Sequence, residues 1–387
     1  MASLAFADIP LSLYVHFPWC VRKCPYCDFN SHALRDNLPE DRYLEALTAD
    51  LDEELAACEG RPLASVFFGG GTPSLVSPGT IAAVIDRIAA KATLAEDVEI
   101  TLEANPGASD RARFAGYRAA GVNRLSIGVQ SFSDRLLKSI GRIHDARGAR
   151  AAVEAARSAG FDNLNIDIMF GLPGQRRDEA AADIDIAIAL LPEHISYYQL
   201  TLEPNTLFYE QPPELPHEDE TFAMQEYALS RLRDNGWFRY EVSAFARRGR
   251  ESVHNRNYWE FGDYLGAGAG AHGKTTASTG VTRYTKPRHP RDYMATVEGF
   301  RRSQKNVGGE DLLFEFMLGA LRLRDGVPLA MFEQRTGIAG DVLERRLMPM
   351  IDRRLVRWAD GRVRTTERGF LYLDDILETL LPPAAGK

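Results

Sequence analysis

The sequence has no long hydrophobic run, no excess of basic residues and no recognisable leader segment. No stretch of about 20 apolar residues occurs, so we expect no membrane-spanning helix, and any membrane contact would be peripheral. The formal net charge of −8 argues against a general nucleic-acid binder, which needs a clear basic excess. Residues 1–10 have neither the basic start nor the apolar core of a signal peptide, so we expect a cytoplasmic protein.

Cysteine is also scarce, because only four occur in 387 residues, and three of these lie within eight residues. A secreted disulfide framework spreads an even number of cysteines along a short chain, so this distribution indicates a metal site instead. The fourth cysteine, Cys58, lies beside Leu55 and Ala57 in a helical stretch. We expect it to pack as a small hydrophobic residue.

Between residues 11 and 243, short β-rich runs alternate with amphipathic helical segments. This alternation is typical of βαβ units around a parallel sheet. Six units are too few to close an eight-stranded barrel, so the sequence predicts an α/β fold with a partial (β/α)6 barrel. Functional residues should then gather where the strands end. The expected strands are 11–17, 65–70, 99–104, 124–130, 163–171 and 194–200, and the clearest helices are 43–58, 81–92 and 179–191.

The pattern changes after the barrel domain, which we place at residues 1–244. Residues 245–305 contain His, Tyr, Trp and Gly without clear periodicity and are interpreted as a structured connector. Residues 306–387 show three short helical patterns, a hairpin at 355–365 and a last helix at 368–381, which together predict a small helical, winged-helix-like domain. Asp360-Gly361 is a strong hairpin-turn signal. Because acidic and basic residues are interleaved, we interpret this domain as structural or partner-binding.

The three clustered cysteines, Cys20, Cys24 and Cys27, form a CxxxCxxC motif directly after the first expected strand. Basic residues beside them would favour the metal-binding thiolate form. Iron–sulfur clusters usually take four thiolates, so three would leave one iron open to an outside ligand. The alternative from spacing alone is a structural zinc site with His16 or His32 as the fourth ligand.

CxxxCxxC after a first strand, with an aromatic residue before the last cysteine, resembles the radical S-adenosylmethionine superfamily. The resemblance implies a 4Fe–4S cluster on the three cysteines, whose open iron is chelated by the amino and carboxylate groups of S-adenosylmethionine. That cofactor supplies the radical chemistry, while the protein binds and orients it. Further matches fall at successive strand ends, beginning with the glycine motif of residues 69–73. By this resemblance the cofactor pocket contains Tyr14, Tyr26, Gly70, Gly71, Thr72, Glu103, Gln130, Arg142, Asp167 and Thr201.

YVHFPWCVRKCPYCDFNSH, FFGGGTPS, EANP, RLSIGVQSF and HNRNYW together resemble the oxygen-independent coproporphyrinogen III oxidase group over residues 11–381. That group contains an oxidative decarboxylase and a heme-chaperone branch. The decarboxylase has a further cysteine where this chain has Phe29, and an N-terminal arm over its active site, whereas here Cys20 is reached almost at once. Both departures favour the chaperone, so coproporphyrinogen oxidase activity is not expected.

The motif HNRNYW, residues 254–259, matches the HNxxYW motif of the chaperone branch. The resemblance implies heme contacts from His254, Asn255, Tyr258 and Trp259, and a neutral imidazole is a common heme ligand. A histidine near Tyr and Trp is, however, often only a packed, hydrogen-bonded residue. Other candidate ligands are His272, His289 and the clustered cysteines.

Two further motifs have simpler interpretations. The run GAGAGAHG at 266–273 lacks the third glycine of a dinucleotide loop, so we expect close chain packing there. Arg283, Lys286 and Arg288 could meet heme propionates, but a solvated loop is the simpler expectation.

The resemblance therefore predicts a heme chaperone that holds a 4Fe–4S cluster and S-adenosylmethionine and delivers heme to respiratory apoproteins, with a homodimer conceivable. Two alternatives remain open. One is a radical S-adenosylmethionine enzyme acting on a porphyrin, including the oxidase itself. The other is a zinc-stabilised binding module.

Overall fold

The computed structural model of the protein describes residues 8–107 and 110–382. Residues 1–7, on which most of the signal-peptide prediction depends, lie outside the described residues. In the described part, no helix is long and apolar enough to cross a membrane.

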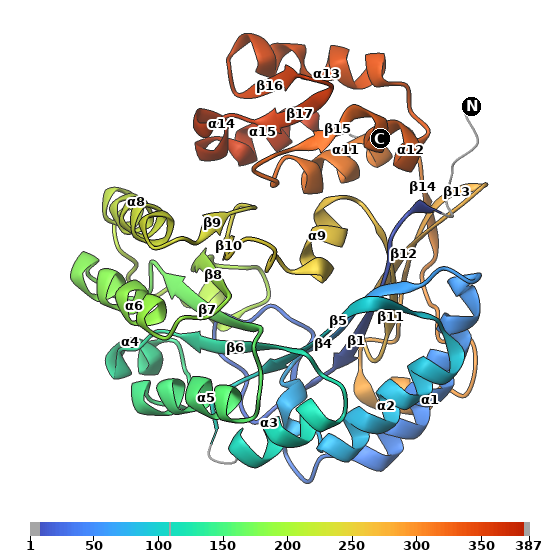
Figure 1. The fold of residues 1–387 in the computed structure, drawn as a ribbon, viewed down its shortest axis with the longest axis vertical. Coiled ribbons are helices and arrows are strands. Elements are labelled where there is room, and N and C mark those ends of the chain that lie inside the picture. Colours follow the sequence, from blue (N-terminus) through green and yellow to red (C-terminus); the bar gives the residue numbers. More distant parts are fainter. Residues whose placement is uncertain (1–7, 108–109, 383–387) are drawn as a thin grey trace.

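The fold is built on an open sheet of 12 strands, in the order β14-β13-β12-β11-β1-β4-β5-β6-β7-β8-β10-β9 (Figure 1). Its middle strands pair in parallel with their neighbours from β1 to β8. These strands confirm the six predicted ones and the partial-barrel architecture. Their bounds are β1 (Leu11–Phe17), β4 (Leu63–Gly70), β5 (Leu94–Ala104), β6 (Arg124–Gln130), β7 (Leu164–Phe170) and β8 (His194–Gln199).

Helices follow each of these strands and cover the outside of the curved sheet (Figure 1). Several begin at a side chain that accepts a backbone N–H, as Ser77 does for the second helix and Asp145 for the fifth. The helices are α1 (Glu40–Leu55), α2 (Pro78–Lys91), α3 (Asp110–Ala119), α4 (Asp134–Ser139), α5 (Ala146–Ser158), α6 (Arg177–Ala189), α7 (Leu207–Glu210) and α8 (Glu218–Asp234), with short 3-10 turns at Ala56–Cys58 and Pro73–Leu75.

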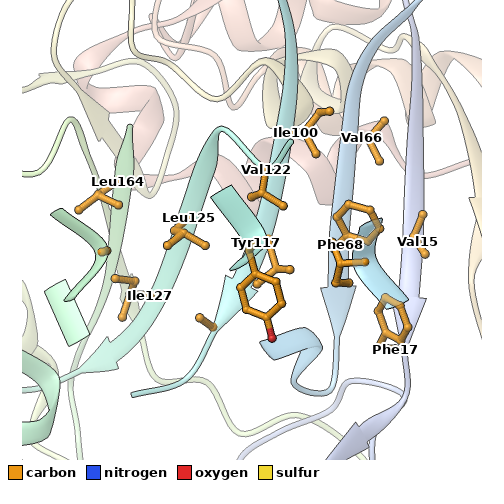
Figure 2. Close-up of a cluster of buried hydrophobic side chains, with 14 of the residues drawn as sticks. Val15, Phe17, Val66, Phe68, Ile100, Tyr117, Val122, Leu125, Ile127 and Leu164 are labelled. Carbon is orange, nitrogen blue, oxygen red and sulfur yellow. The ribbon is translucent and has the colours of Figure 1, made fainter. Parts of the chain in front are cut away.

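The main core lies between this sheet and these helices, where side chains of neighbouring strands meet Tyr117 of α3 (Figure 2). In β1, Leu13, Val15 and Phe17 belong to this core. Because successive side chains of a strand point to opposite faces, Tyr14 and His16 point to the inside of the curved sheet. Cys58 is buried in the same core, as predicted.

Residues 245–305, which were interpreted as a structured connector, contribute further strands to the barrel sheet. β11 (Asp263–Ala267) pairs in parallel with β1, and β12 (His272–Ala277), β13 (Gly280–Thr285) and β14 (Lys305–Val307) continue outward in antiparallel order. Every residue of β11 is buried. Its sequence therefore lacks the alternation of polar and apolar residues by which a half-exposed strand is predicted. The region also contains α9 (Val253–Trp259) and α10 (Pro290–Met294), and the edge strands β9 (Phe238–Arg239) and β10 (Ala244–Ala246) lie at or before its start.

The glycine run at 266–273 allows strands to approach closely, as predicted. A Cβ on Gly266 would lie 2.1 Å from the His272 carbonyl oxygen, and Gly268, with φ of +101°, approaches the His16 backbone. Lys286 corrects the expectation of a solvated basic loop. Its ammonium group is fully buried and forms ion pairs with Asp50 and Glu54 of α1.

The C-terminal domain lies above α9 and carries a three-stranded sheet in the order β15-β17-β16 (Figure 1). The predicted hairpin is confirmed, with Asp360 and Gly361 at positive φ between its strands. The last predicted helix is broken in two at Tyr372, whose backbone is not helical. The elements are α11 (Gly309–Ala320), β15 (Val327–Pro328), α12 (Leu329–Thr336), α13 (Gly340–Asp352), β16 (Val356–Ala359), β17 (Arg362–Thr365), α14 (Glu367–Leu371) and α15 (Leu373–Leu380).

Candidate functional site

The cysteine motif occupies a loop that begins at β2 (Trp19–Cys20) and ends at β3 (His32–Ala33), and these two short strands pair with each other. The Cys27 N–H donates to the Cys24 carbonyl (3.1 Å), which forms a turn between them. Asn30 fixes the end of the loop, because its side-chain amide donates to the carbonyl oxygens of Ala269 and Arg288, at 2.9 Å each.

This loop forms one wall of a cavity of about 460 Å³ at the carboxyl ends of the parallel strands. Fourteen of the predicted site residues border it. They are Cys20, Cys24, Tyr26, Cys27, Gly70, Gly71, Thr72, Glu103, Gln130, Arg142, Asp167 and Thr201 from the barrel region, with Asn255 and Trp259 from α9. Tyr14, His254 and Tyr258 do not line it.

Thr72 begins a chain of hydrogen bonds that joins two of the thiols. Its hydroxyl donates to the Cys20 Sγ (3.5 Å) and accepts from the Asn105 amide (2.9 Å). The Asn105 Oδ1 accepts from the Arg142 Nη2 (2.5 Å), and the Arg142 Nη1 lies 3.9 Å from the Cys24 Sγ. Side chains that follow β4, β5 and α4 therefore orient the cysteine loop.

Contrary to what the sequence had led us to expect, the basic residues beside the cysteines do not lower the pKa values of Cys20 and Cys27 below the ordinary value. Burial raises the pKa of Cys20 and of Cys27, and the hydrogen bond from Thr72 and the charge of Lys23 offset this only in part. A bound metal ion, whose charge exceeds that of any side chain here, deprotonates a coordinating thiol outright.

Of the two histidines proposed as a fourth zinc ligand, His16 is already engaged, whereas the buried Nε2 of His32 has no hydrogen-bond partner among the described residues. The His16 ring engages both of its nitrogens, with the Tyr14 hydroxyl (3.0 Å) and the Asn30 carbonyl (2.8 Å), which leaves none for a metal. Within residues 8–107 and 110–382, no three His, Cys, Asp or Glu side chains converge closely enough to hold a single metal ion. A four-iron cluster has a different requirement, since each of its thiolates binds a different iron.

The glycine motif lies at the end of β4, where larger residues would not fit. A Cβ on Gly71 would lie 2.5 Å from the Trp19 carbonyl oxygen, and a Cβ on Gly70, whose φ is +117°, would meet the His16 ring at 2.7 Å. The Gly70 N–H donates to Glu103 (3.3 Å) and the Gly71 N–H to the Phe17 carbonyl (2.8 Å). The motif therefore also holds β4 against the cysteine loop.

Two half-buried carboxyl groups, Glu103 of β5 and Asp167 of β7, also line the cavity. Burial, followed by the nearby Asp167, raises the pKa of Glu103 to about 8. Burial also raises the pKa of Asp167, although its oxygens accept from Asn165 (2.8 Å) and Ser126 (3.3 Å). Because neither carboxyl group forms an ion pair with a described residue and burial raises both pKa values, this wall is suited to a ligand that carries positive charge or hydroxyl donors.

The remaining predicted residues differ in how they are held. Gln130 ends β6 at a positive φ of 68° and accepts from the Tyr198 hydroxyl (2.7 Å), and Thr201 donates to Glu203 (2.8 Å). Tyr14 lies behind the glycine motif, where its hydroxyl meets His16.

The histidine of the HNxxYW motif lies beneath the cavity wall. His254 is buried, hydrogen-bonded to Ser65 (2.9 Å) and stacked on Phe67 with ring centroids 4.7 Å apart. Burial, followed by the charge of Arg124, lowers its pKa to about 3, so the imidazole is neutral. In this arrangement it packs α9 against β4, while Asn255 and Trp259 of the same helix reach the cavity.

Several residues at the cavity were missed from sequence. Asn105 had a signal, because it directly follows β5 and functional residues were expected where strands end. Glu241, Ser243 and Arg322 had no signal in the sequence. Arg322 belongs to the C-terminal domain rather than to the barrel. The other missed lining residues with polar side chains are Arg22, Asp28, Ser126, Tyr198, Gln199, Ser196 and Glu203.

Two segments of the chain match models of known protein families. Residues 14–187 match the family model of the radical SAM superfamily, and residues 308–372 match that of the HemN C-terminal domain. The chain also resembles the solved structure of the radical SAM enzyme coproporphyrinogen III oxidase (HemN) from Escherichia coli, with a TM-score of 0.82 at 23% identity over 98% of this chain and 92% of that one. The fold is therefore that of a radical SAM protein with a HemN-like C-terminal domain.

Full-length relatives define the group more narrowly. The heme chaperone HemW of Escherichia coli (strain K12) is 46% identical over 96% of this chain and 98% of its own length, and that of Bacillus subtilis (strain 168) is 35% identical over 96% and 99%. The mitochondrial radical S-adenosyl methionine domain-containing protein 1 of Mus musculus is 37% identical over 97% of this chain and 88% of its own. The chain belongs to the HemW family of the radical SAM superfamily.

Membership of the superfamily implies a 4Fe–4S cluster and S-adenosylmethionine, and the residues present fit both groups. Three free thiols on one loop line a cavity that is large enough for a small ligand beside them. The half-buried carboxyl groups Glu103 and Asp167 form no ion pair with a described residue, and a sulfonium and an amino group would supply positive charge beside them.

Proposed function

We propose that the chain is a heme chaperone that holds a 4Fe–4S cluster and S-adenosylmethionine, binds heme at the same cavity and delivers it to respiratory apoproteins. One observation carries this proposal. Trp259 and Asn255 of the heme-associated motif line the same cavity as the three cysteines. A ligand bound against α9 would therefore lie in the compartment that contains the cluster.

In this proposal each wall of the cavity has its own task. Cys20, Cys24 and Cys27 would hold a 4Fe–4S cluster through three thiolates, and the cavity beside them would take S-adenosylmethionine. Such a cluster would supply electrons for radical chemistry on that cofactor. Glu103 and Asp167 accept hydrogen bonds from the cofactor, and the buried walls limit the access of water.

Heme contact is assigned to the side chains that reach the cavity. Trp259 offers an aromatic face to the porphyrin ring and Asn255 a side-chain amide to its polar edge. His254, behind the wall, fixes the position of α9 in the present arrangement. The exposed ring of Phe29 also lines the cavity and adds apolar surface there. The decarboxylase of the group that this sequence resembles has a cysteine at this position.

We further propose that the protein acts in the cytoplasm. All four cysteines are free thiols, and thiols of this kind persist in a reducing compartment.

Heme and porphyrin assays on anaerobically reconstituted protein test the proposal. We expect a spectroscopic heme titration to saturate, and incubation with reductant, S-adenosylmethionine and coproporphyrinogen III to give no decarboxylated product. Trp259→Ala should weaken heme binding about tenfold, corresponding to about 1.4 kcal/mol, because a large aromatic contact is lost. Trp358→Ala, which removes an indole from the β16–β17 hairpin, is the control and should leave affinity unchanged.

Iron and sulfide analysis tests the cluster separately. Cys24→Ala should lose the cluster but retain part of the heme binding, whereas Cys58→Ala, which changes a core thiol, should retain both. Vinyl product formed with stoichiometric 5′-deoxyadenosine would contradict the chaperone and identify a radical oxidase. Zinc in place of iron and sulfide would identify a zinc module.

A further inference from the structure

Arg322 brings the C-terminal domain into contact with the barrel cavity. It follows α11, which lies so close to α9 that a Cβ on Gly319 would be 2.9 Å from the Trp259 carbonyl oxygen. From there the Arg322 side chain reaches the cavity, which it lines together with Trp259 and Asn255. A basic side chain thus stands beside the aromatic face that the proposed function assigns to heme.

The present partners of Arg322 leave part of its guanidinium unused. Its Nη2 donates to the Glu241 Oε2 (3.1 Å) and the Ser243 Oγ (3.3 Å), and its Cζ lies 4.4 Å from the centre of the Trp259 ring. The Arg322 Nε and the Trp259 Nε1 are both buried, yet neither has a hydrogen-bond partner in the described residues.

Two buried donors without an acceptor, on adjacent side chains, are unusual, because buried N–H groups are nearly always hydrogen-bonded. Both unsatisfied groups are donors, so the missing partner is an acceptor. The neighbouring positive charge makes an anion the best acceptor, and a planar guanidinium is suited to two parallel hydrogen bonds with a carboxylate.

We propose that Arg322 and Trp259 form a subsite for a tetrapyrrole carboxylate, in which Trp259 contacts the ring and Arg322 binds a propionate. This inference rests on the proposed function and specifies how its site distinguishes heme from other flat apolar molecules. Glu241 holds Arg322 in place when no ligand is bound, and the ligand carboxylate competes with it for the same guanidinium.

Heme titrations of the full-length, anaerobically reconstituted protein test this subsite. Arg322→Gln should weaken heme binding about tenfold, the effect of losing a hydrogen bond to a charged group, but should not change the affinity for heme dimethyl ester, which lacks free propionates. Arg324→Gln is the matched control, since Arg324 lies two residues further on and pairs with Glu367 outside the cavity. It should leave both affinities unchanged.

A second variant tests the subsite with an effect of opposite sign. Glu241→Gln removes the competing carboxylate at nearly constant size, so heme should bind several-fold more tightly. An equal loss of heme and diester binding in Arg322→Gln, or a loss in Glu241→Gln as large as that in Arg322→Gln, would show that the pair only joins the two domains and would overturn the subsite.

Parallel titrations with coproporphyrin III and S-adenosylmethionine separate this inference from the proposed function. If the wild type binds no heme but binds coproporphyrin III in an Arg322-dependent manner, the chaperone proposal fails and the subsite stands. If only S-adenosylmethionine affinity depends on Arg322, the carboxylate belongs to that cofactor and the tetrapyrrole assignment is overturned. If the wild type binds neither tetrapyrrole, both proposals fail.

Discussion

Arg142 lies against Cys24, with its Nη1 3.9 Å from the cysteine Sγ, while its Nη2 donates to Asn105 and to the Gly128 carbonyl (2.6 Å). The guanidinium is therefore fixed by two strand ends before any cluster binds. Its charge and its N–H groups are available to a sulfur that, in the proposed function, carries an iron.

Replacement of this guanidinium should change the electronic properties of the cluster. A positive charge beside a thiolate ligand favours the reduced, more negative cluster, so Arg142→Met should lower the midpoint potential by an amount on the order of tens of millivolts. A redox titration followed by electron paramagnetic resonance measures this potential. Arg147→Met, at a side chain that is 93% exposed, is the control. An unchanged potential in Arg142→Met would show that the charge does not act on the cluster.

Gly71→Ala should prevent correct placement of the cysteine loop. Its Cβ would meet the backbone of Trp19 at 2.5 Å, and a backbone atom cannot move aside as a flexible side chain can. We expect at least a several-fold loss of iron and sulfide after reconstitution. Gly79→Ala in α2 adds the same methyl group with its nearest neighbour 3.8 Å away and should load normally. Equal loading of both variants would contradict the proposed tight contact.

S-adenosylmethionine binding should depend on pH through Glu103. Its pKa of about 8 means that the carboxyl group is largely protonated at pH 7 and must lose a proton to accept a cationic ligand. Affinity should therefore rise as pH increases from 7 to about 8 and level off above it, by at most about tenfold per pH unit. Isothermal titration calorimetry should show this rise in affinity for the wild type and a weaker rise for Glu103→Gln. Any effect from protonation of the ligand itself is the same in both proteins. Parallel pH profiles would exclude Glu103 as the titrating group.

His254 should make folding stability sensitive to acid. Its folded pKa of about 3 lies below the ordinary value of 6.5, so the unfolded chain takes up the proton first as pH falls. The stability that the neutral, buried ring provides is complete above about pH 6.5 and declines below it, by up to about 1.4 kcal/mol per pH unit. Urea unfolding at pH 7 and pH 5 should show a smaller decline for His254→Gln than for the wild type. His217→Gln, at an exposed histidine, should decline as the wild type does.

The sequence alone determined the elements of the barrel and the cysteine loop. Strand runs bounded by turn residues, and helices between them, are local patterns, which is why six parallel strands were found from sequence, although β5 begins five residues before the expected start at 99. The spacing of Cys20, Cys24 and Cys27 and the glycine motif after β4 are equally local, so the centre of the site could be located without a structure.

Only the tertiary structure decided which distant side chains complete the site. Asn30 bonds Ala269 across 239 positions, and Arg322 meets Glu241 from another domain. No local period encodes such contacts, since they depend on how the sheet curves and where the C-terminal domain packs. The sequence also did not indicate which polar side chains are buried. Lys286 is buried where α1 supplies two carboxylates. His254 lies behind the cavity wall, where it contacts Ser65 and Phe67.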